Sequence, residues 1–133
     1  MSVIDKVQAL QLPDDQYVVI GSGLLDAWGL RESHDVDLVV SGELFESLAR
    51  SGRYTLGSKP NGDRFLSDDT YEIFDNWGEE GTFEQLYRYS IMVDTVRFVS
   101  PDYLIRQKAD RGWEKDLQDI MLIQEKMTHD HAR

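Results

Sequence analysis

The chain has 133 residues, 41% of them hydrophobic and 11% aromatic, a composition typical of one globular domain and not of a disordered chain. Its net charge of −11 argues against general nucleic-acid binding, which normally needs a basic patch, and the absence of cysteine excludes disulfides and thiolate metal sites. No apolar run approaches the roughly 20 residues of a membrane span, and the first residues lack the apolar core of a signal peptide. We therefore expect a cytoplasmic protein that does not bind membranes.

Hydrophobic periodicity and turn residues predict alternating helices and strands. In chain order, we predict a helix over residues 3–12, a strand over 17–20, a helix over 24–28, a strand over 35–40, a helix over 42–50, a hairpin with strands at 54–56 and 65–66, a strand over 70–74, a loop at 78–81, a helix over 82–89, a strand over 95–99, and helices over 102–110 and 114–127. Residues 128–133 are predicted to form a disordered tail. No repeat or linker divides the sequence, so we expect one domain over residues 1–133, of the α/β (α+β) class, with a mixed sheet flanked by helices.

A Gly-Ser pair and an Asp-x-Asp motif are the most informative part of the sequence. Gly21 and Ser22 directly follow the first predicted strand, and Asp35 and Asp37 lie at the start of the second. Because residues i and i+2 of a strand point to the same side, the two aspartates project together while Val36 faces the core. Paired carboxylates repel each other unless a cation lies between them, and their hard oxygens suit Mg²⁺ or Mn²⁺. The alternative is a solvated turn, since Asp is common where turns begin.

The combination of these motifs at this spacing resembles the signature of the DNA polymerase β-like nucleotidyltransferase superfamily, in particular its small bacterial, antibiotic-type members. That signature is an apolar residue, Gly-Ser or Gly-Gly, a gap of similar length, Asp-apolar-Asp-apolar, and later a third carboxylate between apolar residues. The resemblance covers residues from about 17 to 123 and implies a nucleotidyltransferase fold. It also implies that Asp35 and Asp37 are catalytic ligands of Mg²⁺ or Mn²⁺ and that the substrate is a nucleoside triphosphate. Unlike larger relatives, the chain has no separate substrate-binding domain.

The third carboxylate of that signature has two candidates. Glu72 lies between two apolar residues, whereas Asp75 is followed by Asn76, so Glu72 fits the signature and Asp75 does not. Strand alternation sends Glu72 and Asp75 to opposite faces, and both cannot reach the same site. We select Glu72 as the third catalytic acid, acting as a ligand of the activating metal or as a general base. The alternative is a solvated residue on an edge strand.

The resemblance assigns nucleotide-binding roles to residues around the first motif. Gly21 lets a phosphate approach the backbone closely, and Ser22 opens a helix N-terminus whose N–H groups and hydroxyl can hold triphosphate oxygens. Arg31 and Ser33 resemble the Arg and Thr/Ser that often precede the aspartates of the family, and both are candidates for nucleotide binding. An ion pair of Arg31 with a neighbouring acid, Glu32 or Asp26, is an equal alternative.

The C-terminal third carries a second set of family-like elements. Lys108 lies one helical turn after an apolar residue, on a face that packs inward, so it is a candidate phosphate ligand. The alternative for Lys108 is a solvated lysine. Arg111, Lys115 and Asp116 resemble the Arg and Lys-Asp elements of small nucleotidyltransferases, but an i,i+4 pair of Lys115 with Asp119 explains the same pattern. The roles of Lys115 and Asp116 stay open.

The expected reaction is transfer of a nucleoside monophosphate to a hydroxyl of a small acceptor such as an aminoglycoside or a lincosamide, an antibiotic-resistance activity. In so short a chain, the acceptor pocket is either open or completed by the second subunit of a homodimer. Trp77 and Tyr87 are candidates to line it, although aromatic residues here also fit the core. One alternative is an antitoxin-like protein of a toxin–antitoxin pair that binds or AMPylates its partner toxin. A degenerate relative that only binds nucleotides is another alternative, which retention of all three acids disfavours.

Overall fold

The computed structural model describes residues 2–76 and 81–131. Its helices are α1 (Val3–Leu10), α2 (Gly23–Ala27), α3 (Gly42–Arg50), α4 (Phe83–Arg88), α5 (Pro101–Arg111) and α6 (Glu114–His131). Its strands are β1 (Tyr17–Ile20), β2 (Val36–Val40), β3 (Thr55–Ser58), β4 (Arg64–Ser67), β5 (Tyr71–Phe74), β6 (Ile91–Val93) and β7 (Val96–Phe98). The elements predicted from the sequence are present, with small shifts at their ends.

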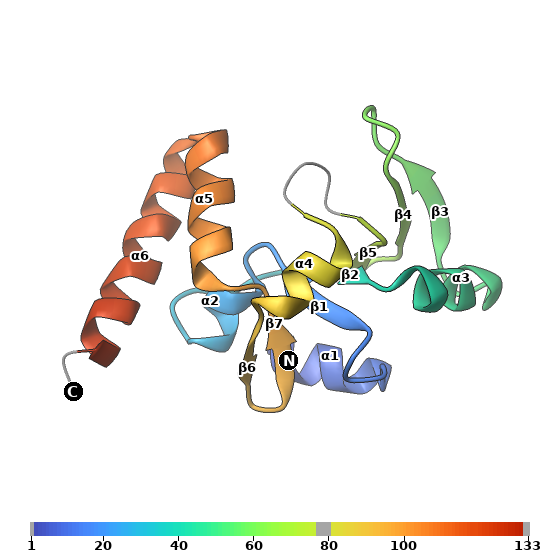
Figure 1. The fold of residues 1–133 in the computed structure, drawn as a ribbon, viewed down its shortest axis with the longest axis horizontal. Helices are drawn as coiled ribbons and strands as arrows, with labels where there is room; N and C mark the ends of the chain where they lie inside the picture. Colours follow the sequence, from blue (N-terminus) through green and yellow to red (C-terminus); the bar gives the residue numbers. More distant parts are fainter. Residues whose placement is uncertain (1, 77–80, 132–133) are drawn as a thin grey trace.

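The described strands form one mixed sheet in the order β3-β4-β5-β2-β1-β7-β6 (Figure 1). β2 pairs antiparallel with β1 and parallel with β5, and β1 pairs parallel with β7. Side chains from the sheet and the helices pack into one continuous core. These features confirm the predicted class, a single mixed α/β domain.

One residue of β2 differs from the other four in its burial. β2 lies inside the sheet, and four of its five residues are buried, as expected for a strand covered on both faces. Val36 is 1% exposed, which confirms that it faces the core. Asp37 is the exception: it is half-buried, so its side chain is partly in contact with solvent.

Helices α5 and α6 form an antiparallel pair that stands beside the sheet in Figure 1. α5 begins by the expected rule of cap and proline, with the Ser100 hydroxyl accepting from the Asp102 N–H and Pro101 in the first turn. α5 ends at Gly112, whose φ of 71° permits the tight turn into α6. The turn places Lys108 and Arg111, near the end of α5, and Lys115, near the start of α6, at the same end of the pair.

The structure differs from the sequence prediction at two places. β6, which was not predicted, forms a hairpin with β7 through Asp94 and Thr95, whose φ angles are 47° and 68°. Two consecutive positive φ angles are typical of a type I′ turn, for which Asn-Gly is the usual sequence signal. The predicted disordered tail is also wrong in part, because α6 continues as a helix over residues 128–131. The predicted loop at 78–81 lies mostly outside the described residues.

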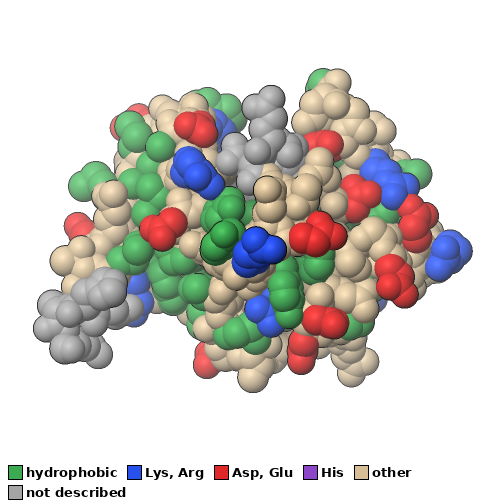
Figure 2. Space-filling model, in the orientation of Figure 1, with side chains coloured by type: hydrophobic (Ala, Val, Ile, Leu, Met, Phe, Trp, Pro, Cys, Tyr) green, Lys and Arg blue, Asp and Glu red, His purple; other side chains and the backbone are tan. Residues whose placement is uncertain are grey.

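Charged side chains are spread over the surface. On the face shown in Figure 2, Lys and Arg side chains lie singly among Asp and Glu. Within the described residues, no helix combines the length and apolar character that crossing a membrane requires.

Candidate active site

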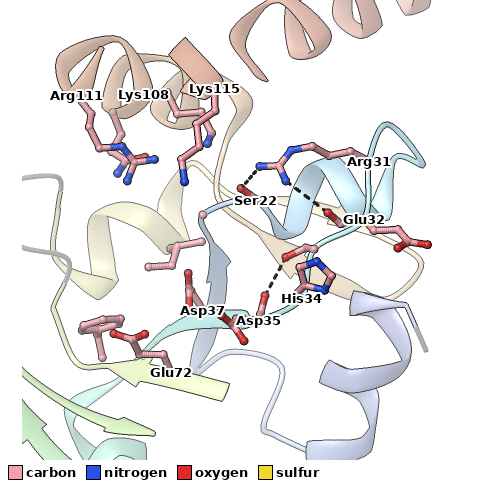
Figure 3. Close-up of a pocket in the computed structure, with 15 residues that line it drawn as sticks. Ser22, Arg31, Glu32, His34, Asp35, Asp37, Glu72, Lys108, Arg111 and Lys115 are labelled. Atoms are coloured by element: carbon pink, nitrogen blue, oxygen red, sulfur yellow. Dashed lines mark hydrogen bonds between the residues drawn. The ribbon is translucent and has the colours of Figure 1, made fainter. Parts of the chain in front are cut away.

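A cleft of about 410 Å³ lies between the ends of β1 and β2 and the helices α5 and α6 (Figure 3). Acids from β2 and β5 line one wall, and cations from the loop after α2 and from the helix pair line the other. The lining residues are Ile20, Gly21, Ser22, Arg31, Glu32, Ser33, His34, Asp35, Asp37, Glu72, Phe74, Gln107, Lys108, Arg111 and Lys115. The fold thus brings every residue that the sequence assigned to catalysis or nucleotide binding into one cleft.

The acidic wall is built by strand pairing. Asp37 and Glu72 are direct neighbours, because β2 and β5 pair in parallel with these two residues in register. Strands paired in this way lie roughly 4.8 Å apart. Asp35 precedes β2 and lies beside Asp37 in Figure 3. Asp75 instead accepts a hydrogen bond from Arg64 Nε at 3.0 Å, so the acid that reaches the cleft is Glu72, as the sequence predicts.

The acidic wall holds one carboxyl group with a strongly raised pKa. Burial, then the charges of Glu72 and Asp35, raises the pKa of Asp37 to about 6, while the Lys59 ammonium acts in the opposite direction. A divalent cation beside these groups would remove the repulsion that raises this pKa. The donor set, carboxylate oxygens, is the one that Mg²⁺ and Mn²⁺ prefer.

The three acids are not yet arranged as a metal centre. In the described part of the chain, no three acidic or histidine side chains converge in a geometry that could hold a metal ion. The Glu72 carboxylate is turned to Lys59, with 2.8 Å between Oε1 and Nζ. The donors therefore have the right chemistry for a divalent cation, but one oxygen of Glu72 is paired with Lys59.

Gly21 is placed where a side chain would meet the acidic wall. Its φ is +65°, and a Cβ atom there would lie 3.0 Å from Asp37 Oδ2. Ser22 follows as the N-cap of α2, but its side chain makes no capping bond and instead accepts from Arg31 Nη2 at 2.8 Å. Glycine thus satisfies both the backbone conformation and the space beside Asp37.

We expect Gly21→Ala to destabilise the protein more than Gly29→Ala, by about 1 kcal/mol or more because of the crowding against Asp37. Gly29 is a matched control, since its φ is +73° but a Cβ atom there would have nothing within 4 Å. Both substitutions carry the strain of a left-handed backbone, about 1–2 kcal/mol, so the difference isolates the contact with the carboxylate. Urea unfolding measures both values. Equal losses in the two variants would show that Asp37 moves aside without cost.

The cationic wall is held in place by two buried aspartates of α6. Asp119 accepts from Arg31 Nε and Nη2, each at 2.8 Å, and from Lys108 Nζ at 3.0 Å. Asp116 accepts from Arg111 Nε at 2.8 Å and from Arg111 Nη2 at 2.6 Å, and lies 3.6 Å from Lys108 Nζ. The network has three cations for two carboxylates, so it leaves positive charge at the cleft.

The pKa values of both aspartates follow from these bonds. The hydrogen bond with Arg111 lowers the pKa of Asp116 to about 2 against the opposing effect of burial. For Asp119, burial alone would raise the pKa, but the bonds from Arg31 and Lys108 outweigh it and lower the pKa below its usual value. Both groups are therefore ionised at neutral pH, and the network is ionic.

This network resolves several alternatives that the sequence left open. The partner of the Arg31 side chain is Asp119, and neither Glu32 nor Asp26 provides the carboxylate. Lys108 is not solvated, since its side chain is 2% exposed. The alternative pair of Lys115 with Asp119 is not formed among the described residues, where Asp119 binds Arg31 and Lys108.

Lys115 is a cation of the cleft whose role could not be decided from the sequence. Its ammonium lies 5.5 Å from the centre of the Trp113 ring, and no carboxylate of the described residues lies within ion-pair distance of it. The residue is exposed and lines the cleft. Lys115 is therefore the cation there with the most freedom to meet an anion, which its position on the helix alone did not indicate.

Ser33 and His34 shape the approach to Asp35. The Ser33 hydroxyl donates to the Asp35 carbonyl at 2.9 Å, and the Ser33 N–H donates to Asp26 Oδ2 at 2.9 Å. The His34 carbonyl accepts from Lys6 Nζ at 3.2 Å. Ser33 thus holds the loop that carries Asp35, in addition to lining the cleft.

The aromatic residues suggested for the acceptor pocket lie elsewhere or outside the described part. Tyr87 packs against Phe83, with 5.7 Å between the ring centres, and Arg97 lies 4.3 Å above the Tyr87 ring. Tyr87 is not among the residues that line the cleft, so it is a packing residue. Trp77 lies outside the described residues.

No protein-family model matches this chain, and no curated protein sequence matches it either.

Proposed function

We propose that the protein is a metal-dependent nucleotidyltransferase that transfers a nucleoside monophosphate from a nucleoside triphosphate to a hydroxyl group. The observation that carries this proposal is the pairing of Asp37 with Glu72 across β2 and β5, beside Asp35 and opposite a cationic wall. Acids suited to a divalent cation and cations suited to phosphates face one cleft. That is the arrangement which a metal–triphosphate substrate requires.

In the proposed reaction, the acceptor oxygen forms a bond to the α-phosphorus as the bond from this phosphorus to the bridging oxygen breaks. Pyrophosphate leaves with the electron pair, and the acceptor proton passes to Glu72 or to water. A bound Mg²⁺ or Mn²⁺ would be held by Asp35, Asp37 and Glu72, where it would supply charge neutralisation and lower the pKa of the acceptor hydroxyl. Water is the eventual destination of the proton in either route.

The cationic wall would hold the triphosphate. The exposed cations of the wall are Arg31, Arg111 and Lys115, and Ser22 presents its hydroxyl at the same edge. Arg31 and Lys108 share Asp119, which orients both side chains. After its bonds to Asp119, Ser22 and the Glu32 carbonyl, Arg31 keeps one N–H group for a phosphate, and Lys108 keeps at least one. Arg31 and Lys108 therefore act both as phosphate ligands and as supports of the wall.

A protein acceptor is the second candidate, favoured by one observation on α6. Trp113, which directly precedes α6, and Leu117 and Met121 of this helix follow each other at intervals of four residues and are 57%, 52% and 61% exposed. Apolar side chains at this spacing share one helix face, as in helices that bind partners. The stripe is consistent with an antitoxin-like protein that binds or modifies a partner toxin, while the small acceptor and the homodimer stay predictions from the sequence.

We expect Glu72→Gln to reduce nucleotidyl transfer by about a hundredfold or more, the usual range for loss of a catalytic acid or base. The matched control is Asp75→Asn on the same segment, which breaks an exposed pair with Arg64 and should cost about 0–1 kcal/mol of stability without loss of transfer. The assay incubates each protein with Mg²⁺, radiolabelled ATP, GTP, CTP or UTP, and aminoglycosides, lincosamides or cell protein.

The distribution of label decides between the candidates. Label on a small acceptor supports the main proposal, and label on a partner protein alone supports the second candidate. If Asp75→Asn were inactive and Glu72→Gln active, the assignment of the third acid would be wrong. Wild-type protein that labels nothing and binds no nucleotide with Mg²⁺ would contradict the proposed function.

A further inference from the structure

Lys59 lies at the turn between β3 and β4 and reaches the acidic wall from outside the cleft lining. Its ammonium is 2.8 Å from Glu72 Oε1, 4.7 Å from the centre of the Phe65 ring and 5.8 Å from that of the Phe74 ring. Phe65 and Phe74 are themselves paired, with 5.9 Å between ring centres. The two rings and one carboxylate therefore hold the Lys59 ammonium at a defined place.

The backbone of the hairpin fixes the position from which Lys59 extends. The Lys59 N–H donates to the Asp63 carbonyl at 2.8 Å, and the Gly62 N–H donates to the Lys59 carbonyl at 2.9 Å. Opposite Phe65 in the register is Gly57, where a Cβ atom would lie 2.6 Å from the Phe65 ring. The glycine makes room for the ring over which the lysine lies. The contact of Lys59 with Glu72 is thus supported by the turn, by the strand register and by the aromatic pair.

We infer that Lys59 is a positioning residue that holds Glu72 away from Asp37 in the metal-free protein. A divalent cation must displace the Lys59 ammonium from Glu72 before Glu72 can bind that cation. This inference rests on the proposed metal site. Asp37 and Glu72 are in register on adjacent strands, so a side-chain rotation of Glu72 is enough to bring its carboxylate towards Asp37. Lys59 and a divalent cation compete for the same carboxylate, and the metal-free protein avoids two adjacent unpaired charges.

The test compares Mn²⁺ affinity in nucleotide-free full-length protein by titration calorimetry at neutral pH. Lys59→Met keeps the stem over the two rings and removes the charge, so we expect Mn²⁺ to bind about two- to fivefold more tightly, the range that an exposed ion pair supports. Lys59→Arg restores a cation and is expected to return the affinity towards wild type. Arg106→Met removes one positive charge from an exposed residue of α5 that does not line the cleft and so controls for net charge, with an expected change of less than about twofold.

A double-mutant cycle shows whether the effect passes through Glu72. In a Glu72→Gln background, Lys59→Met should change Mn²⁺ affinity by less than about twofold, because the competed carboxylate is absent. Unchanged or weaker Mn²⁺ binding by Lys59→Met would overturn the inference, as would an equal gain in Arg106→Met. The proposed function would then stand if Asp37→Asn abolished Mn²⁺ binding in the same assay. A wild-type protein with no saturable Mn²⁺ binding would overturn both.

Discussion

Asp37→Asn is expected to stabilise the metal-free protein and at the same time to abolish nucleotidyl transfer. The pKa of Asp37 is raised to about 6 by burial and by the charges of Glu72 and Asp35. Between the unfolded value of 3.8 and about 6, the folded state therefore binds more protons than the unfolded state. The free energy of unfolding falls as pH rises through this window, and the loss persists at neutral pH. Asparagine has no charge to bury and removes that loss.

The gain in stability is at most about 3 kcal/mol at pH 7.5, because each pKa unit corresponds to about 1.4 kcal/mol. At pH 3.5, where Asp37 is protonated in both states, the variant and the wild type should have similar stability. Transfer should fall by about a hundredfold or more, since the residue is proposed to hold the metal. Urea unfolding at the two pH values and the label-transfer assay measure the two effects. A variant that is less stable than wild type at pH 7.5 would contradict the conclusion that ionised Asp37 destabilises the folded state.

Asp119→Ala is expected to be strongly destabilising, by about 3–5 kcal/mol, which is the usual cost of removing one partner from a buried ionic network. Lys108 is 2% exposed and would keep one carboxylate, Asp116, at 3.6 Å. The matched variant is Arg31→Met, which removes the more exposed partner and leaves Asp119 bonded to Lys108. Its loss should be smaller, about 1.5–3 kcal/mol, the range for a hydrogen bond to a charged group.

Thermal or urea unfolding of these two variants gives the order of the losses. If Arg31→Met cost as much as Asp119→Ala, the exposed guanidinium rather than the buried lysine would be the partner that matters.

The stabilisation that the ionic network provides should also be lost in acid. Because the pKa of Asp116 is lowered to about 2, its contribution is present above the unfolded value of 3.8 and is lost as pH falls through about 2. The combined contribution of Asp37 and Asp116 to the stability of the metal-free protein is greatest near the unfolded value of 3.8.

The parts of the fold that the sequence predicted are those with local signals. Tyr17–Ile20 is a run of β-branched and aromatic residues and is buried throughout, and Thr82 caps α4 through a capping box with Gln85. The acids of the cleft were also within reach of sequence reasoning, because strand alternation alone separates Glu72 from Asp75. In each case the signal lies within a few residues of the feature it predicts.

The parts that sequence reasoning missed depend on contacts between distant residues. The bonds of Arg31 with Asp119 join positions 88 residues apart, and neither residue carries a local mark of its partner. The i,i+4 rule offered Lys115 as one possible partner of Asp119, but Asp119 binds Arg31 and Lys108 instead. Lys59 was missed because its proximity to Glu72 depends on the register of a hairpin. Helix and strand patterns do not contain such information.

The pairing of β1 with β7 has a consequence for how the protein is made. Val19 pairs with Phe98, so the sheet cannot be completed until most of the chain has left the ribosome. The acids of the cleft lie at positions 35, 37 and 72, before β7 in the chain, whereas Lys108, Arg111 and Lys115 lie after it. Non-local pairings of this kind form slowly, and domains acquire such contacts late in synthesis. The acidic wall is therefore synthesised before the cations of α5 and α6, and the proposed triphosphate site is incomplete until these two helices dock.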